Sequence, residues 1–181
     1  PESLERQIQA VLSEGKLKPR VVVAVDFLGN PCDYDAIAAI CDKYGLTLLE
    51  DAAQSMGASY KGKMCCSFGT ISTTSFFPAK TLGCYGDGGA IFTDDDALAD
   101  LLRSICVHGE GPGGKYDNIR AGVNSRWDNL QATILLPKLE ALEEYEIRDR
   151  EAAAGRYSAA FQGKFVLPPV EQDSQHSWYH Y

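Results

Sequence analysis

The stretch "RVVVAVDFLGNPCDYDAIAAICDKYGLTLLE", residues 20–50, contains the pattern that decides the fold. Its first eight residues hold a continuous apolar run, which predicts a β-strand covered on both faces. Apolar residues then recur at helical spacing, between Asp33 as an N-cap and Gly45 as a C-terminal stop. The apolar segment "LTLLE" follows at once and predicts a second strand. This order is typical of a strand-helix-strand unit in a parallel sheet.

The same alternation continues along the chain. Further strands are predicted at 70–77 and 88–93, and "DDDALADLLRSICVHG" after them predicts a helix. An amphipathic helix is predicted at the start of the chain, and one long helix, bent at Pro137, from 125 to about 162. We therefore expect an α/β fold with a mainly parallel sheet flanked by helices.

Composition excludes several classes of protein. The 181 residues are 45% hydrophobic, enough for a buried core, and the net charge is −8. The sequence has no run of basic residues long enough to bind along a phosphodiester backbone. It also has no apolar run of the ~18 residues needed to span a bilayer. The six cysteines lack C-x-x-C spacing, so we expect reduced thiols and no metal site. We expect a cytoplasmic protein that binds neither nucleic acid nor membrane.

Candidate site residues follow two of the predicted strands, because ligands of parallel α/β sheets bind beyond the carboxyl ends of the strands. Asp51 ends the strand "LTLLE", and Gln54 comes three residues later, where a turn into a helix would point both the same way. A helix cap is the simpler interpretation of Asp51 alone. Ser75 and Lys80 stand at either end of "SFFPAK", although a lone lysine is usually a surface ammonium group.

Several motifs agree with one family in type and order. These are "EDAAQS" (50–55), "SFFPAK" (75–80), "LGCYGDGGAIFT" (82–93), "VHG" (107–109) and "VNSRWDNLQATILLPKL" (123–139). Together they resemble the sugar-nucleotide aminotransferases of the DegT/DnrJ/StrS family, which are pyridoxal-phosphate (PLP) enzymes with the aspartate-aminotransferase fold (fold type I). The likeness runs from about residue 1 to 160. Because complete members are much longer, it implies a fragment, with 1–162 in the large PLP-binding domain and 163–181 beginning the small C-terminal domain.

The resemblance implies the main chemical roles. Lys80 matches the lysine that binds pyridoxal phosphate covalently, and burial behind Phe76, Phe77 and Pro78 would favour its neutral, nucleophilic amine. Asp51 matches the carboxylate that pairs with the pyridine nitrogen and so makes the ring an electron sink.

Further cofactor contacts are implied in the same way. Gln54 matches a contact with the ring or its 3-oxygen, and Ser75 matches a hydroxyl donor to the phosphate. Asn124 matches an amide that reaches the phosphate in the neighbouring subunit, which implies a homodimer. The glycines after Lys80 would permit tight turning and close approach of the backbone; they are Gly83, Gly86, Gly88 and Gly89.

The implied reaction moves an amino group from an amino acid, such as glutamate, to a keto group of a nucleotide-linked sugar. The residues of these motifs are most similar to those of family members that aminate a UDP-linked 3-keto N-acetylglucosaminuronate for bacterial surface polysaccharide. Arg126 would then bind the uronate carboxylate, unless it is a structural arginine at the helix start. Two alternatives stay open: dehydration of a keto sugar, for which some relatives carry histidine in place of the lysine, and a non-catalytic relic of the fold.

Overall fold

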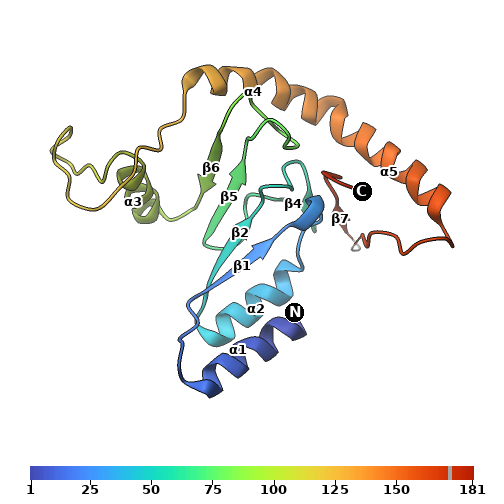
Figure 1. The fold of residues 1–181 in the computed structure, drawn as a ribbon, viewed down its shortest axis with the longest axis horizontal. Coiled ribbons are helices and arrows are strands. Elements are labelled where there is room, and N and C mark those ends of the chain that lie inside the picture. Colours follow the sequence, from blue (N-terminus) through green and yellow to red (C-terminus); the bar gives the residue numbers. More distant parts are fainter. Residues whose placement is uncertain (171–172) are drawn as a thin grey trace.

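A four-stranded sheet forms the centre of the computed structural model, which describes residues 1–170 and 173–181 (Figure 1). Its strand order is β1 (Val21–Val25), β2 (Thr47–Asp51), β5 (Ile71–Ser75) and β6 (Gly89–Phe92). The first three strands are parallel, and β6 runs antiparallel to β5. Because Val25 pairs with Asp51 and Asp51 with Thr73, the carboxyl ends of these three strands meet at one edge. The predicted α/β fold with a mainly parallel sheet is confirmed.

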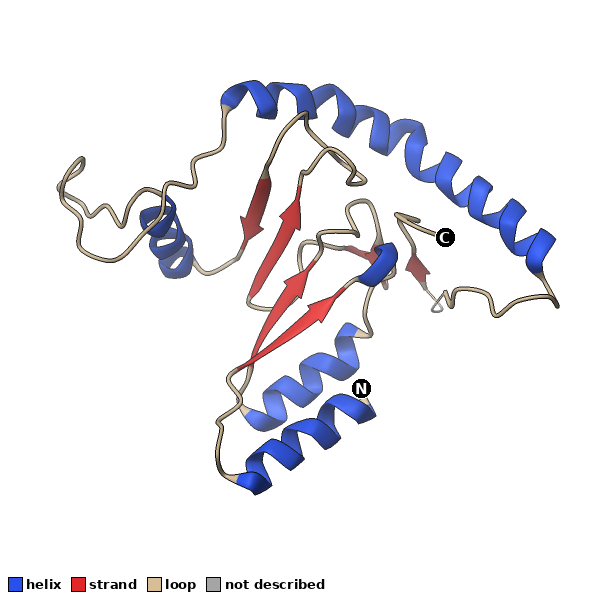
Figure 2. Ribbon diagram, viewed as in Figure 1, coloured by secondary structure: helices blue, strands red, loops and turns tan. Residues whose placement is uncertain are grey.

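Two helices, α1 (Glu2–Glu14) and α2 (Tyr34–Tyr44), lie beside β1 and β2 (Figure 2). The predicted caps of α2 are present: the Asp33 carboxylate accepts a hydrogen bond from the Ala36 amide at 3.1 Å, and Gly45 ends the helix with φ 62°. This side of the sheet holds the first core cluster: Val22, Ala24, Tyr34, Cys41, Leu48 and Tyr60.

The other face of β1 is open, so the prediction of a strand covered on both faces is wrong for this chain. The side chains of Val21, Val23 and Val25 are between 44% and 55% exposed, whereas Val22 and Ala24 are buried. Successive side chains of a strand point to opposite faces. The helices α1 and α2 therefore cover only the face that carries Val22 and Ala24.

The predicted long helix is present as three consecutive segments (Figure 1). They are α4 (Asn129–Ala141), a π-helical segment η2 (Leu142–Glu146) and α5 (Ile147–Phe161). Residues 125–128 are not helical, so the predicted start is four residues too early. Pro137 lies inside α4, and the departure from α-helical hydrogen bonding comes after it, in η2. This helix packs against the segment 76–84 through Leu135, Leu142 and Ile147.

The remaining elements are short. Helix α3 (Asp96–Cys106) follows β6, and a three-stranded antiparallel sheet joins β4 (Lys63–Met64), β3 (Ser59–Tyr60) and β7 (Ser174–Gln175). One 3-10 turn, η1 (Phe27–Gly29), follows β1. All six cysteines are free thiols. Within the two described ranges, no helix is both long and apolar enough to cross a membrane.

Candidate functional site

Asp51 and Gln54 lie where β2 ends, as predicted, but residues 53–57 form turns and not the start of a helix. The Asp51 side chain is half-buried, and its Oδ1 atom accepts a hydrogen bond from the Ala53 amide at 3.1 Å. The Gln54 Oε1 atom accepts a hydrogen bond from the Leu28 amide at 2.6 Å. Asp51 therefore keeps its second oxygen for a ligand, and Gln54 keeps its amide hydrogens.

Ser75 and Lys80 follow the adjacent parallel strand. Ser75 is the last residue of β5, on the same face as Thr73 and its register partner Asp51. The Ser75 hydroxyl oxygen accepts a hydrogen bond from the Phe77 amide at 3.3 Å, so its proton remains available to a ligand. A turn closed by the Lys80 amide and the Phe77 carbonyl, 2.8 Å apart, then carries the half-buried Lys80.

The shielding of Lys80 differs from the prediction. Phe76 is buried against the long helix, but Phe77 is 49% exposed and Pro78 is also exposed. A residue that the sequence did not suggest lies against the lysine instead: the Lys80 Nζ atom is 5.2 Å from the centroid of the Tyr179 ring. Tyr179 comes from the end of the chain, in a segment with no periodic pattern, so only the folded structure reveals the contact.

Close approach explains three of the four glycines after Lys80. A Cβ atom would lie 2.6 Å from the Pro78 carbonyl oxygen on Gly83, 2.4 Å from Nε1 of Trp127 on Gly88, and 2.7 Å from the Thr74 carbonyl oxygen on Gly89. The expectation of close approach is therefore confirmed at these three positions. Positive φ is not the reason for any of the four glycines, because each has φ outside the left-handed region. The backbone at Gly83 therefore packs directly against the turn that carries Lys80.

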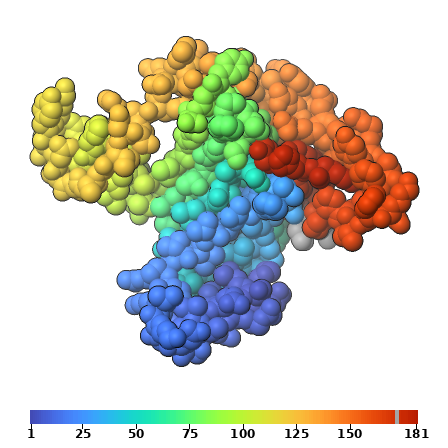
Figure 3. Space-filling view, in the orientation of Figure 1, coloured from blue at the N-terminus to red at the C-terminus, as the bar shows by residue number. Residues whose placement is uncertain are grey.

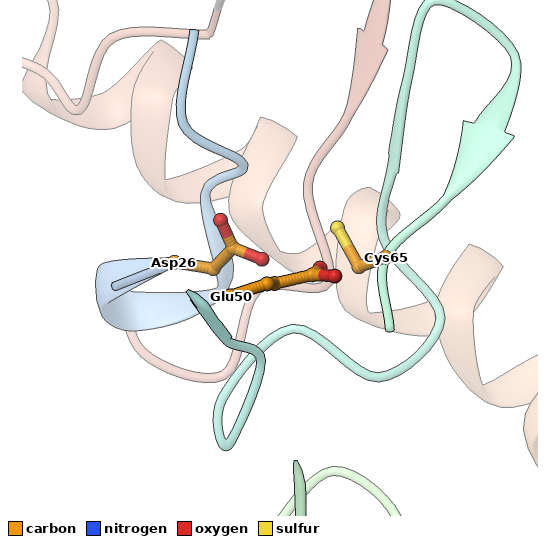
Figure 4. A group of neighbouring side chains, drawn as sticks. All are labelled: Asp26, Glu50 and Cys65. Carbon is orange, nitrogen blue, oxygen red and sulfur yellow. The ribbon is translucent and has the colours of Figure 1, made fainter. Parts of the chain in front are cut away.

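A buried polar cluster of Asp26, Glu50 and Cys65 lies where β1 and β2 end (Figure 4). One potential ligand atom from each lies within 4.8 Å of the others, which is a spacing that a metal ion could use. Burial raises the pKa of the Glu50 carboxyl, and the neighbouring Asp26 carboxylate adds to the increase.

The two carboxylates of this cluster already have protein partners. Their hydrogen-bond donors are the amides of Cys32, Cys66 and Phe68 and the hydroxyls of Tyr34 and Ser55, at 2.6 to 3.0 Å. Each carboxylate oxygen therefore accepts at least one hydrogen bond. These hydrogen bonds hold the ends of β1 and β2 against the surrounding turns, and we assign the cluster a structural role.

Asn124 and Arg126 lie before the start of α4. Both are exposed on the segment 107–128, whose loop is drawn in yellow at the far left of Figure 1. Asn124 forms a β-bridge with Val107, and the Arg126 Nε atom donates a hydrogen bond to Asn124 Oδ1 at 3.2 Å. The parallel register of β2 and β5 places Asp51, Gln54, Ser75 and Lys80 at one edge of the sheet. Asn124 and Arg126 contact each other, and the next residue, Trp127, stacks on Phe76 with ring centroids 5.1 Å apart.

The side chains at the ends of β2 and β5 fit the pyridoxal phosphate that the resemblance implies. Lys80 offers a primary amine for the aldehyde, and Asp51 offers a carboxylate oxygen for the ring nitrogen. The Ser75 hydroxyl proton suits a phosphate oxygen. These donors come from one edge of one sheet, where α/β folds bind ligands.

Comparisons with known proteins agree with the family resemblance. The sequence profile described as the DegT/DnrJ/EryC1/StrS aminotransferase family matches residues 1–181. The UDP-2-acetamido-2-deoxy-3-oxo-D-glucuronate aminotransferase of Pseudomonas aeruginosa is 54% identical over 153 residues, which cover 83% of this chain and 42% of that protein.

Two solved structures show the same architecture. A DegT DnrJ EryC1 StrS aminotransferase from Brucella abortus superposes with a TM-score of 0.95 at 46% identity, covering 99% of this chain and 48% of that one. DesV of S. venezuelae, solved in complex with a ketimine intermediate, gives a TM-score of 0.83 at 36% identity, covering 93% and 46%.

The chain spans less than half the length of these relatives. The match nevertheless extends over the whole chain in sequence and nearly all of it in structure. The motifs around Asp51, Lys80 and Asn124 lie at the end of β2, after the end of β5 and on the segment before α4. This chain belongs to the DegT/DnrJ/EryC1/StrS aminotransferase family.

Proposed function

We propose that the protein carrying this chain is a PLP-dependent aminotransferase that moves an amino group from an amino acid, such as glutamate, to a keto group of a nucleotide-linked sugar. One observation carries this proposal. Lys80 stands on the turn after β5, and Asp51 ends β2 beside it, in parallel register. An amine for the aldehyde and an acid for the ring nitrogen are the two groups that pyridoxal chemistry requires from a protein.

Each site residue has a role in this proposal. Bound pyridoxal phosphate supplies an electron sink that stabilises negative charge on the substrate carbon. Asp51 would hold the proton on the ring nitrogen, Ser75 would donate to the phosphate, and the Gln54 amide would donate to the ring oxygen. The Lys80 Nζ atom would bond to the aldehyde carbon between turnovers. When the amine is free, the same atom would move the proton between the substrate carbon and the cofactor's C4′.

The similarity to the P. aeruginosa enzyme supports a UDP-linked 3-keto uronate as the substrate. In this proposal Arg126 binds the uronate carboxylate and Asn124 the cofactor phosphate, each across the interface of a homodimer. Residues 1–162 belong to the large cofactor-binding domain, and 163–181 begin a smaller one. The six free thiols suit the reducing cytoplasm, which we propose as the compartment.

The retained lysine favours amino transfer over elimination. Elimination or dehydration of the keto sugar is the alternative for the same cofactor, and product analysis separates the two. Nitrogen from labelled glutamate in the sugar supports transfer. A deoxy sugar without nitrogen contradicts it.

Covalent labelling of Lys80 tests the function directly. Borohydride should remove the visible absorbance band of the complete, cofactor-loaded protein, and peptide mapping should place the label on Lys80. Lys80→Ala should abolish labelling and lower turnover on the order of 10³-fold, because a lost proton-transfer group costs about that much. Lys115→Ala is the matched control, since Lys115 also lies over a tyrosine ring, 5.0 Å from that of Tyr116. A label on another lysine would refute the proposed site.

A further inference from the structure

The last residues of the chain lie beside the candidate site. Tyr179 contributes a half-buried aromatic ring, and the Lys80 Nζ atom lies over it, 5.2 Å from the ring centroid. Cation-π attraction acts within about 6 Å of a ring centroid. Neither partner is close to the other in sequence, so the contact depends on where the segment 174–181, called the tail below, is held.

The tail is fixed to the turns that carry the site. Ser177 is fully buried; its amide donates a hydrogen bond to the Gly29 carbonyl at 3.0 Å, and its hydroxyl donates one to the Gln54 carbonyl at 2.8 Å. The close approach needs a glycine, because a Cβ atom on Gly29 would lie 2.1 Å from Ser177 Oγ. The same Gln54 holds the Leu28 amide through its side chain. The side chain of Ser177, two residues before Tyr179, is thus bonded to Gln54, which follows Asp51 by three positions.

The opposite side of the tail is held by helix α5. Tyr181 and Ser158 share a hydrogen bond between their hydroxyls at 3.0 Å, and the Tyr181 ring packs 5.3 Å from that of Tyr157. The Arg150 Nη1 atom donates a hydrogen bond to the Trp178 carbonyl at 3.5 Å. Contacts on both sides of residue 179 leave its ring little freedom to move away from Lys80.

We propose that Tyr179 is a positioning residue for Lys80, and that its ring holds the ε-amino group at the site whenever the amine is not bonded to the cofactor. This inference rests on the proposed function, and it adds to it a residue for the step in which the lysine leaves and returns. The negative face of the ring attracts the charged amine, and its flat surface limits the rotamers of a long, flexible side chain. The role needs the ring and not the hydroxyl.

A spectroscopic experiment tests the contact without using activity. Reductive ¹³C-methylation of the cofactor-free, complete protein labels its lysines, and Lys80→Arg identifies the Lys80 signal. The aromatic ring current should displace that signal upfield in the wild-type protein and in Tyr179→Phe, and Tyr179→Leu should remove the displacement. Tyr116→Leu is the matched control, because it removes an exposed ring that lies beside another lysine.

A second measurement tests the positioning role. The rate at which added pyridoxal phosphate becomes borohydride-stable on Lys80 should fall about 3- to 10-fold in Tyr179→Leu, because the lysine side chain regains rotamers that point away from the aldehyde, and recover in Tyr179→Phe. A displacement that persists in Tyr179→Leu overturns the contact. A lost displacement with an unchanged rate overturns the positioning role. A wild-type protein that shows the displacement but takes up no cofactor at Lys80 refutes the proposed function and leaves the contact intact, so the two failures are distinguishable.

Discussion

Arg126 is the residue on which the choice of sugar depends in the proposed function. Its Nε atom is engaged by Asn124, so the two terminal nitrogens of the guanidinium remain for a carboxylate. Two parallel hydrogen bonds from this fork give both affinity and geometry that a lysine cannot reproduce.

We therefore expect Arg126→Ala to lower kcat/KM for a UDP-linked 3-keto uronate about 10- to 100-fold, the worth of charge-assisted hydrogen bonds. A neutral keto sugar should lose much less. Arg126→Lys, which keeps the charge without the fork, should lie between the wild type and Arg126→Ala on the uronate. Steady-state kinetics on the two sugars provide the measurement. An equal loss on both would show that Arg126 is structural.

The positions of residues that depend on neighbouring sequence, such as helix caps and strand ends, were predicted well. The positions of residues that depend on contacts between distant segments were not. Asp33 and Gly45 cap α2 as their types and positions indicated, and Asp51 follows a strand whose pattern is visible in the sequence. Tyr179 lies near Lys80 because Ser177 bonds to Gly29, and no local pattern reports a contact between such distant segments. Phe77 and Pro78 were expected to shield the lysine from position alone, whereas the turn directs them to solvent.

At the scale of elements, the tail joins the candidate site to α5, and a buried histidine holds the bend within it. The Trp178 amide donates a hydrogen bond to Nδ1 of His176 at 2.8 Å, and the two rings stack with centroids 4.1 Å apart. This bond requires an unprotonated Nδ1 atom. Burial lowers the pKa of His176 from 6.5 to about 4.

This shift makes the docking of the tail dependent on pH. Between about pH 6.5 and pH 4 the unfolded tail binds a proton that the docked tail does not, so stability falls as the pH falls through this window. The total loss should be on the order of 2 kcal/mol. Below pH 4 both states are protonated, and above pH 6.5 neither is, so the contribution of His176 is then constant.

Hydrogen exchange at the Ser177 amide should report this loss. Exchange should accelerate as the pH is lowered from 6.5 to 4, after correction for the intrinsic rate. His176→Asn keeps an acceptor near the position of Nδ1 and cannot titrate, so its corrected exchange should not vary across the window. The same pH dependence in His176→Asn would rule out His176 as the cause.

At the scale of the whole molecule, one face of β1 and one long segment are exposed. The valines of β1 that point away from α1 and α2 are 44% to 55% exposed. The sequence predicted the strand correctly but not this one-sided cover, because an apolar run looks the same whether one or two layers pack on it. The yellow segment 107–128 protrudes from the body in Figure 3, with Asn124 and Arg126 on it.

A protruding segment that carries two site residues suits a site completed by a second subunit, and mixed dimers test this. In a dimer of one Lys80→Ala subunit and one Asn124→Asp subunit, a site shared across the interface would be intact once, since the unchanged Lys80 faces the unchanged Asn124 of its partner. Asp in place of Asn124 would repel the cofactor phosphate, so each variant alone should be nearly inactive.

Random mixing makes half of the dimers hybrids with one of two sites intact, so about a quarter of the wild-type activity should return after the two variants are mixed, unfolded and refolded together. Mixing Lys80→Ala with Lys80→Arg is the control, because neither subunit then supplies the amine. If Asn124 serves the site of its own chain, every site in the first mixture carries a defect and no activity returns.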